Sequence, residues 1–154
     1  MAAERLREFL DRRGVKYISI RHSPAFTAQE IAELAHVAGR DFAKTVIVKI
    51  EGELAMVVLP ATRRLVLSDL AELLEKSPVK LASEEEFVTH FPDCEAGAMP
   101  PFGYLYGMRT YVAGSLTEQK EIAFNAGTHH EVIKMAYDDF AAIVTPVVLD
   151  FVTN

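Results

Sequence analysis

The sequence has a single cysteine, Cys94, among its 154 residues, and it has neither a long apolar run nor an excess of positive charge. One cysteine excludes an intramolecular disulfide and fits a reducing compartment. No apolar run approaches the ~20 residues that span a bilayer, and the chain opens with the charged segment 1–8 rather than an apolar signal segment. These features predict a cytoplasmic protein with no membrane partner.

The net charge of −6 argues against a protein that coats DNA or RNA non-specifically, because that mode of binding needs many phosphates to be neutralised. We expect no DNA partner, and any contact with RNA must be local. The basic residues that could make such a contact are scattered along the sequence, and by default we expect them to form a solvated surface: Lys44, Lys49, Arg63, Arg64, Arg109 and Lys134.

Common catalytic and metal-binding patterns are also missing. The sequence has no P-loop, no Gly-x-Gly-x-x-Gly after a strand and no His-Glu-x-x-His. The adjacent His129 and His130 would point to opposite sides of a strand, which makes them a poor metal chelate. His90 and Cys94 are separated by Pro92 and lack a third orienting group, so a thiol nucleophile is not favoured. We therefore expect no metal and no cofactor.

What the sequence does contain is a mixed series of helix and strand patterns. Helical spacing or a capping pattern predicts helices near 6–10, 27–35, 68–74, 83–88 and 138–143, with Thr27, Ser68 and Ser83 as caps. Aliphatic and β-branched segments predict strands at 16–21, 43–50, 53–59, 104–106, 110–112, 121–124 and 131–135. Glu51-Gly52 suits a tight hairpin turn. Since there is no linker or repeat, we expect one α+β domain over residues 1–154.

The most informative segment is 94–107, which places two consecutive prolines between glycines. Pro100 and Pro101 fix φ and remove two amide donors, whereas Gly97 and Gly103 permit backbone conformations closed to other residues. A rigid loop with exposed main-chain groups is a recognition surface. The alternative is an ordinary turn between a helix and a strand.

Lys44 lies on an apolar face of its predicted strand, because side chains alternate and it shares that face with Val46, Val48 and Ile50. One explanation is that Lys44 extends to water from the start of the strand. The other is a fixed positive charge at the mouth of an apolar pocket, suited to holding a phosphate or polarising a carbonyl.

A third polar segment, 124–135, runs from a strand through a Gly-containing turn into another strand. Asn125, Thr128 and His129 offer varied hydrogen-bonding groups there. The segment is either a polar hairpin tip or part of a binding site.

In their order, these segments resemble the YbaK family, the free-standing relatives of the editing domain inserted in bacterial prolyl-tRNA synthetases. The resemblance covers nearly the whole chain. Its carriers are His22-Ser-Pro-Ala with the following helix, Ala43-Lys44-Thr45-Val-Ile-Val, Pro60-Ala61, the Gly97-Ala98-Met99-Pro100 loop and the 124–135 hairpin. It implies a compact α+β domain with a mixed, partly barrel-like β-sheet flanked by helices.

The resemblance also implies a trans-acting deacylase that hydrolyses the ester between a wrong amino acid and the terminal adenosine of a tRNA, most often a proline tRNA. Lys44 would hold the backbone of the terminal nucleotide, and the loop from Gly97 to Pro100 would present main-chain groups to the aminoacyl group. These are the implied catalytic residues. Catalysis would use a water and no metal, through positioning and electrostatic stabilisation. The implied partners are the acceptor end of a mischarged tRNA and an aminoacyl-tRNA synthetase.

The last hairpin departs from the Gly-Gly-Lys-Arg-Gly pattern of some relatives, which leaves the rejected amino acid open among alanine, cysteine, serine and threonine. Other residues expected to bind the substrate are Phe26, Thr45, Met56, Ala98, Met99, Phe102, Asn125, Thr128 and His129. A non-catalytic module that binds an aminoacyl-tRNA end, an aminoacyl nucleotide or a small metabolite would use the same pocket, and it is the alternative function.

Overall fold

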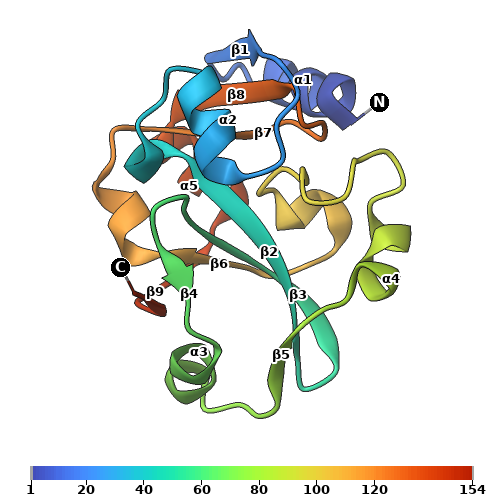
Figure 1. The fold of residues 1–154 in the computed structure, drawn as a ribbon, viewed down its shortest axis with the longest axis vertical. Coiled ribbons are helices and arrows are strands. Elements are labelled where there is room, and N and C mark those ends of the chain that lie inside the picture. The colour runs from blue at the N-terminus through green and yellow to red at the C-terminus, as the bar shows by residue number, and fades with distance from the viewer. Residues whose placement is uncertain (1, 154) are drawn as a thin grey trace.

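The strands of the protein form three sheets in a computed structural model, which describes residues 2–153 (Figure 1). The largest has the order β5–β2–β3–β6–β9, from Val79–Leu81, Ala43–Ile50, Glu53–Pro60, Thr110–Ala113 and Val147–Leu149. The second has the order β1–β8–β7, from Tyr17–Arg21, Glu131–Ala136 and Glu121–Asn125. The third pairs β4 (Arg64–Leu65) with β10 (Val152–Thr153). The α+β class and the mixed sheet are confirmed, although within residues 2–153 no sheet closes into a barrel.

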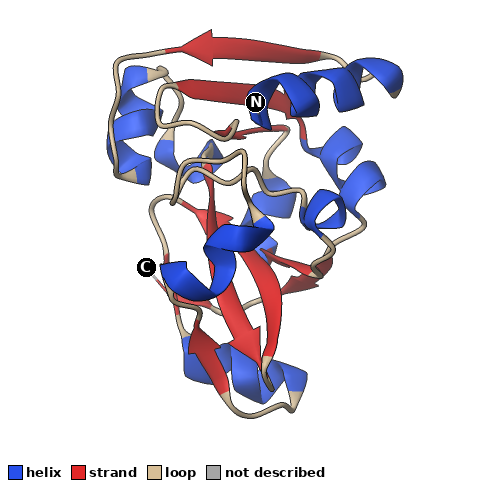
Figure 2. Cartoon of the chain, turned by 90° about the vertical axis from the view of Figure 1, so that its right-hand side faces the viewer, coloured by secondary structure: helices blue, strands red, loops and turns tan. Residues whose placement is uncertain are grey.

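Helices lie around these sheets, as Figure 2 shows. They are α1 (Ala2–Arg12), α2 (Ala28–Leu34), α3 (Leu67–Leu74), α4 (Glu84–Phe87) and α5 (Tyr137–Val144). Short 3-10 turns occupy Gly39–Asp41, Val88–His90, Gly103–Tyr106 and Gly114–Glu118. None of the helices described is long and apolar enough to cross a membrane.

Local sequence signals account for several boundaries. The side chain of Thr27 accepts a hydrogen bond from the Glu30 main chain, and Ser83 forms a reciprocal capping box with Glu86. Glu51 and Gly52 both have positive φ, 50° and 87°, as a two-residue hairpin turn requires. These three predictions are confirmed.

Two local predictions are wrong. Residues 104–106 form a 3-10 turn because the Met108 main chain donates back to the Gly103 carbonyl at 2.9 Å and Gly107 adopts φ +69°, which closes the segment into a turn. The helix predicted to be capped by Ser68 begins at Leu67, two residues before the start that a cap at Ser68 would give. Val66 occupies the cap position without a side-chain hydrogen bond, so Ser68 lies inside the helix.

The core is divided by β2, whose side chains alternate between two apolar clusters. Ala43 and Ile47 join the larger cluster, and Val48 and Ile50 join the cluster on the other side. A third cluster lies under α2. It contains Phe42, which forms a parallel bridge with Ala123 of β7. This bridge brings the start of β2, and with it Lys44, to the junction between the two larger sheets.

Candidate functional site

A shallow cavity of about 270 Å³ lies where the start of α2 meets the start of β2 and the turn that follows β3. Lys44 reaches it as the second residue of β2, opposite Leu59 in the antiparallel ladder. The lining residues are Thr27, Ala28, Gln29, Lys44, Ala61, Thr62, Arg63 and Arg64. Lys44 therefore faces an open cavity and not only bulk solvent.

Lys44 is half-buried, and its surroundings disfavour a positive charge. Burial lowers the pKa of its ammonium below the ordinary value, and the positive charge of Arg64 lowers that pKa further. An anion in the cavity would offset both effects. The environment of Lys44 thus favours binding of a negatively charged group.

The Gly97–Pro100 loop is held by hydrogen bonds to the tip of the β7–β8 hairpin. The Glu95 main chain donates to the Gly127 carbonyl at 2.8 Å, and Gly127 donates to the Ala98 carbonyl at 2.9 Å. His129 is bonded twice: its main chain donates to the Glu95 carboxylate at 2.7 Å, and its Nε2 lies 2.8 Å from the Ala96 carbonyl oxygen. The loop and the hairpin tip form one rigid unit.

Gly97 is at the exposed turn of this loop and has φ +84°. A Cβ built there would lie 3.5 Å from His129 Cε1, which is an ordinary contact distance. The backbone conformation, more than the available space, thus requires glycine. In the part of the chain that the structure describes, the Gly97 N–H has no main-chain acceptor, so it is available to a ligand.

Phe26 connects this unit to the cavity. Its ring lies 4.9 Å from the His129 ring, and the neighbouring Ala25 main chain donates to the His129 carbonyl at 3.2 Å. The next residue along the chain, Thr27, lines the cavity that contains Lys44. Phe26 is 77% exposed, so one face of its ring is open to a binding partner. A series of neighbouring residues therefore links the Lys44 cavity to Gly97 through Thr27, Phe26 and His129.

Four of the predicted residues have a buried polar atom without a hydrogen-bond partner within residues 2–153. These atoms are Thr45 Oγ1, Asn125 Oδ1, Thr128 Oγ1 and His129 Nδ1. Buried polar atoms are nearly always paired, so each such atom calls for a partner from outside the chain, such as an ordered water or a ligand. Three of the four lie at the hairpin tip beside the loop, where a polar ligand would satisfy them.

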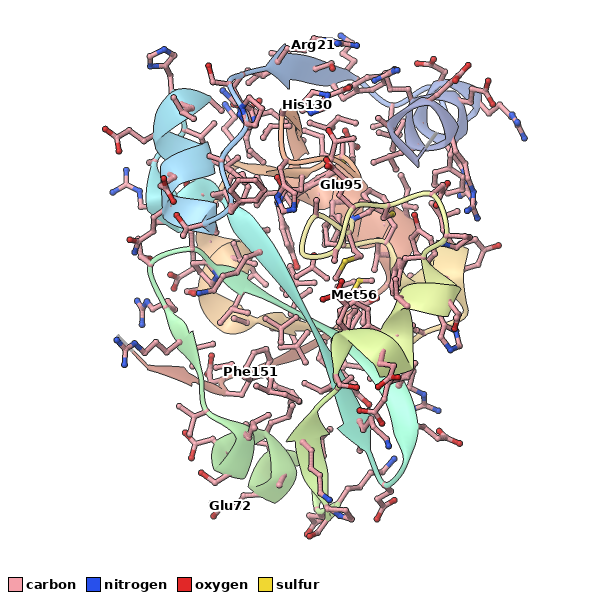
Figure 3. The ribbon with its side chains drawn as sticks, turned by 45° about the vertical axis from the view of Figure 1, so that its right-hand side comes forward. Arg21, Met56, Glu72, Glu95, His130 and Phe151 are labelled. Carbon is pink, nitrogen blue, oxygen red and sulfur yellow. The ribbon has the colours of Figure 1, made fainter. Side chains whose placement is uncertain are left out.

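Other predicted residues lie deeper. Met56, Met99 and Phe102 belong to the largest core cluster, and Ala98 and Pro100 are also buried. The Phe102 ring packs edge-on against Phe124 and Phe140, in each case at 5.4 Å between centroids. Figure 3 shows Met56 in the interior and Glu95 and His130 toward the surface. These buried residues anchor the loop, and their direct contact with a substrate stays a prediction.

Metal and thiol chemistry find little support in this part of the molecule. Among the described residues, no three His, Cys, Asp or Glu side chains are grouped so that they could hold a metal ion. Burial raises the pKa of the Cys94 thiol to about 11, and its sulfur lies 3.5 Å from the Tyr106 hydroxyl. Cys94 is therefore protonated near neutral pH and is not an activated nucleophile.

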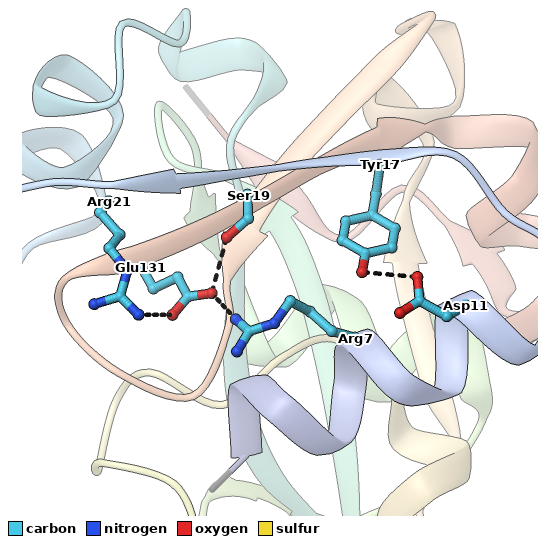
Figure 4. Close-up of polar contacts among 6 residues, drawn as sticks. All are labelled: Arg7, Asp11, Tyr17, Ser19, Arg21 and Glu131. Atoms are coloured by element: carbon cyan, nitrogen blue, oxygen red, sulfur yellow. Dashed lines mark hydrogen bonds and ion pairs between the residues drawn. The ribbon is translucent and has the colours of Figure 1, made fainter.

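Sequence reasoning missed two carboxylates that position the site. Glu95 holds the His129 main chain, and the buried Glu131 begins β8 directly after the hairpin tip. Glu131 accepts a hydrogen bond from Ser19 at 2.9 Å and forms ion pairs with Arg7 and Arg21, as Figure 4 shows. In the sequence, Glu131 is recognisable only as an acidic residue at the start of an apolar strand. Its partners Arg7 and Ser19 lie more than a hundred positions away.

Comparison with known proteins gives one family. The model of the aminoacyl-tRNA editing domain family matches residues 22–143. The multifunctional Ser/Thr-tRNA deacylase ProXp-y of Escherichia coli K12 is 27% identical over 153 residues, which cover 96% of this chain and 91% of that protein.

Two solved structures share the fold over nearly their whole length. The hypothetical protein APE2540 superimposes with a TM-score of 0.85 and 25% identity, covering 96% of this chain and 99% of that one. A proposed trans-editing enzyme for prolyl-tRNA synthetase superimposes with a TM-score of 0.83 and 22% identity, covering 99% of this chain and 98% of that one.

Proposed function

The chain belongs to the aminoacyl-tRNA editing domain family, and we propose that this trans-acting aminoacyl-tRNA deacylase holds the reacting end of its substrate between Lys44 and the Gly97–Pro100 loop. The family that the sequence predicted is thereby confirmed. The assignment of the site is supported by the series of neighbouring residues that links Lys44 to Gly97 through Phe26 and His129. This series joins a cation in a cavity to an available main-chain N–H.

The reaction is hydrolysis of an ester. A water oxygen bonds to the aminoacyl carbonyl carbon, and the bond from that carbon to the ribose oxygen breaks. One proton of the water ends on the ribose oxygen, and the other is released as the free amino acid forms its carboxylate. Lys44 binds the phosphate of the terminal nucleotide and so fixes the position of the ester. The Gly97 N–H donates to the carbonyl oxygen as negative charge develops on it. Orientation and electrostatic stabilisation supply the rate enhancement without a side-chain nucleophile.

The hairpin tip determines which amino acid is removed. Asn125 Oδ1, Thr128 Oγ1 and His129 Nδ1 are buried polar atoms that a hydroxyl-bearing side chain would satisfy. The E. coli relative is named as a Ser/Thr-tRNA deacylase. Both facts support serine or threonine as the amino acid that is removed, and both are among the small residues predicted from the sequence. We propose that the tRNA from which it is removed is a proline tRNA, which is the first to test.

The cellular setting follows from the substrate. Aminoacyl-tRNAs are made and used in the cytoplasm, so we place the deacylase there. An aminoacyl-tRNA synthetase is the proposed protein partner, because it is the source of mischarged tRNA. We further propose that residues 1–154 act as one editing domain. Co-purification with a synthetase in the presence of tRNA tests the partnership.

A panel of tRNAs tests the function. Proline tRNA charged with serine, threonine, alanine, cysteine or proline is incubated with the protein, and the release of amino acid is measured. We expect fastest release of serine or threonine, and loss of release in Lys44→Ala. Lys49→Ala is the matched control, because Lys49 is on the same strand but pairs with Glu86. Binding of these tRNAs without turnover would instead favour the non-catalytic module.

A further inference from the structure

Three cations converge on the cavity at the start of β2. Lys44, Arg63 and Arg64 all line it, and no carboxylate is among its lining residues in the described chain. The closest acidic residue in the sequence of α2, Glu30, accepts a hydrogen bond from Thr27 Oγ1 at 2.7 Å and is not part of the lining. The cavity therefore concentrates positive charge in a protein whose net charge is −6.

The other candidate basic residues differ from these three. Lys49 is paired with Glu86, and Lys134 lies 3.6 Å from Glu121. Over residues 2–153, no carboxylate lies within salt-bridge distance of Lys44, Arg63 or Arg64. Three uncompensated cations around one cavity form a site for an anion from outside the chain.

The turn that carries the two arginines is fixed. Ala61 donates to the Phe42 carbonyl at 2.8 Å, and the Arg63 main chain donates to the Pro60 carbonyl at 3.0 Å. Arg64 is paired with β10. Gly39 packs so closely on this turn that a Cβ there would lie 2.7 Å from a methyl group of Thr62. The main chain that carries the arginines is thus preorganised, which lowers the part of the entropic cost of binding that comes from ordering the loop.

An exposed aromatic ring lies beside this charge. Phe26 directly precedes Thr27 of the cavity lining and leaves 77% of its surface exposed. Positive charge along a groove, combined with an open aromatic face, is the arrangement that binds single-stranded nucleic acid through its phosphates and bases.

We propose that Arg63 and Arg64 bind the phosphodiester that precedes the terminal nucleotide of the substrate tRNA, while Phe26 stacks on a base of its single-stranded end. The inference rests on the proposed function, because Lys44 is taken to bind the last phosphate. Guanidinium groups suit a phosphate because their planar donors bind two of its oxygens at once. In this way an acidic protein would bind RNA over only a short stretch.

The test compares two substrates and two double variants. Wild type, R63Q/R64Q and R12Q/R13Q are assayed on mischarged tRNA and on a 3′-aminoacyl adenosine, which has no phosphodiester. R12Q/R13Q removes the same charge from a consecutive arginine pair at the end of α1. We expect R63Q/R64Q to lower kcat/KM on tRNA roughly tenfold and on the adenosine less than about twofold.

Salt dependence and direct binding complete the test. The slope of log kcat/KM against log salt should become shallower by about 0.7 for each phosphate that the variant no longer binds. Binding of an uncharged acceptor-stem RNA with a single-stranded CCA end, followed by fluorescence anisotropy, should weaken in R63Q/R64Q and not in R12Q/R13Q.

Three results would overturn the inference: equal losses on the two substrates, equal losses in the two double variants, or unchanged RNA affinity in R63Q/R64Q. A wild type that hydrolyses neither substrate would overturn the proposed function instead. In that event the anisotropy measurement would still decide whether the arginines bind RNA.

Discussion

Arg7 of α1 and Glu131 of β8 form an ion pair that joins the first helix to the strand leaving the site. Glu131 is 3% exposed and also bonds to Ser19 and Arg21, so its charge is fully compensated within the fold. Because β8 begins at Glu131, two residues after His129, this network fixes the position of the hairpin tip relative to α1 and β1.

Glu131→Gln should destabilise the protein by about 3 kcal/mol, because it leaves the partly buried Arg7 without its partner. The free energy of unfolding is measured by urea denaturation. Glu121→Gln, which removes an exposed partner of Lys134, is the control and should cost about 1 kcal/mol or less. Equal effects in the two variants would show that the Glu131 network is no stronger than a surface pair.

Lys44→Arg should lower kcat/KM on mischarged tRNA at least tenfold, since a longer, planar guanidinium does not place its charge where the compact ammonium does. The far-UV circular dichroism and the melting temperature should stay close to those of the wild type, because Lys44 is only half-buried. Full activity in the arginine variant would show that Lys44 acts only by long-range electrostatic attraction of the substrate.

The deacylation activity should decrease as the pH rises, and the decrease should begin below pH 10.5, the ordinary pKa of lysine. Burial and the positive charge of Arg64 lower the pKa of Lys44, and its ammonium is the active form. In the unfolded chain Lys44 keeps its proton to a higher pH than in the folded chain. Stability attributable to Lys44 therefore rises with pH between the lowered pKa and 10.5. The pH profile of kcat/KM, corrected for spontaneous ester hydrolysis, checks the activity. A flat profile up to 10.5 would contradict a charged role for Lys44.

Gly97→Val should reduce the deacylation rate far more than Gly52→Val reduces it. Both glycines have φ near +85° (84° and 87°), so both substitutions introduce similar backbone strain, about 1–3 kcal/mol. Only Gly97 lies beside His129, where a branched side chain would obstruct the N–H offered to the substrate. Pro100→Ala should slow the reaction less, by relaxing the loop.

Single-turnover rates and melting temperatures of these three variants separate the two effects. If Gly97→Val melts well below the wild type yet keeps its rate while folded, the loop is a structural turn and not a substrate-binding element.

Cys94→Ala and addition of EDTA should each leave the deacylation rate within about twofold of the untreated wild type, because the thiol is held protonated by burial. Cys94 should also resist iodoacetamide at pH 8, which mass spectrometry of the intact protein measures. A large loss of rate in either treatment would mean that the reaction uses a thiolate or a metal.

Local signals predicted local structure well. The capping side chain of Thr27 and the Glu51-Gly52 turn act within four residues, so the sequence alone was sufficient for both. Ser68 failed as a cap because α3 begins at Leu67, after a Val66 cap position that has no side-chain hydrogen bond. The aromatic run at 104–106 failed because two flanking glycines closed it into a turn.

Relations across the fold were beyond the sequence. Arg63 and Arg64 were predicted to be solvated surface residues. The predicted hairpin brings the turn after β3 near Lys44, but it does not show that the start of α2 completes a cavity there. The role of Glu95 depends on a main-chain group 34 positions away. The residues alone predicted the loop and the lysine as separate features, and only the family resemblance placed them in one site. In the structure, Phe26 packs on His129 between them.

The strand order β1–β8–β7 also determines when the site can exist during synthesis. β1 is complete near the start of translation, but its pairing partner β8 lies 112 positions later at the Ser19–Glu131 contact. The same late hairpin supplies Asn125, Thr128 and His129. A nascent chain therefore carries Lys44 and the loop without a reaction site. Such distant pairing also slows folding. The newly made chain therefore becomes able to cleave aminoacyl-tRNA only after β7 and β8 have left the ribosome.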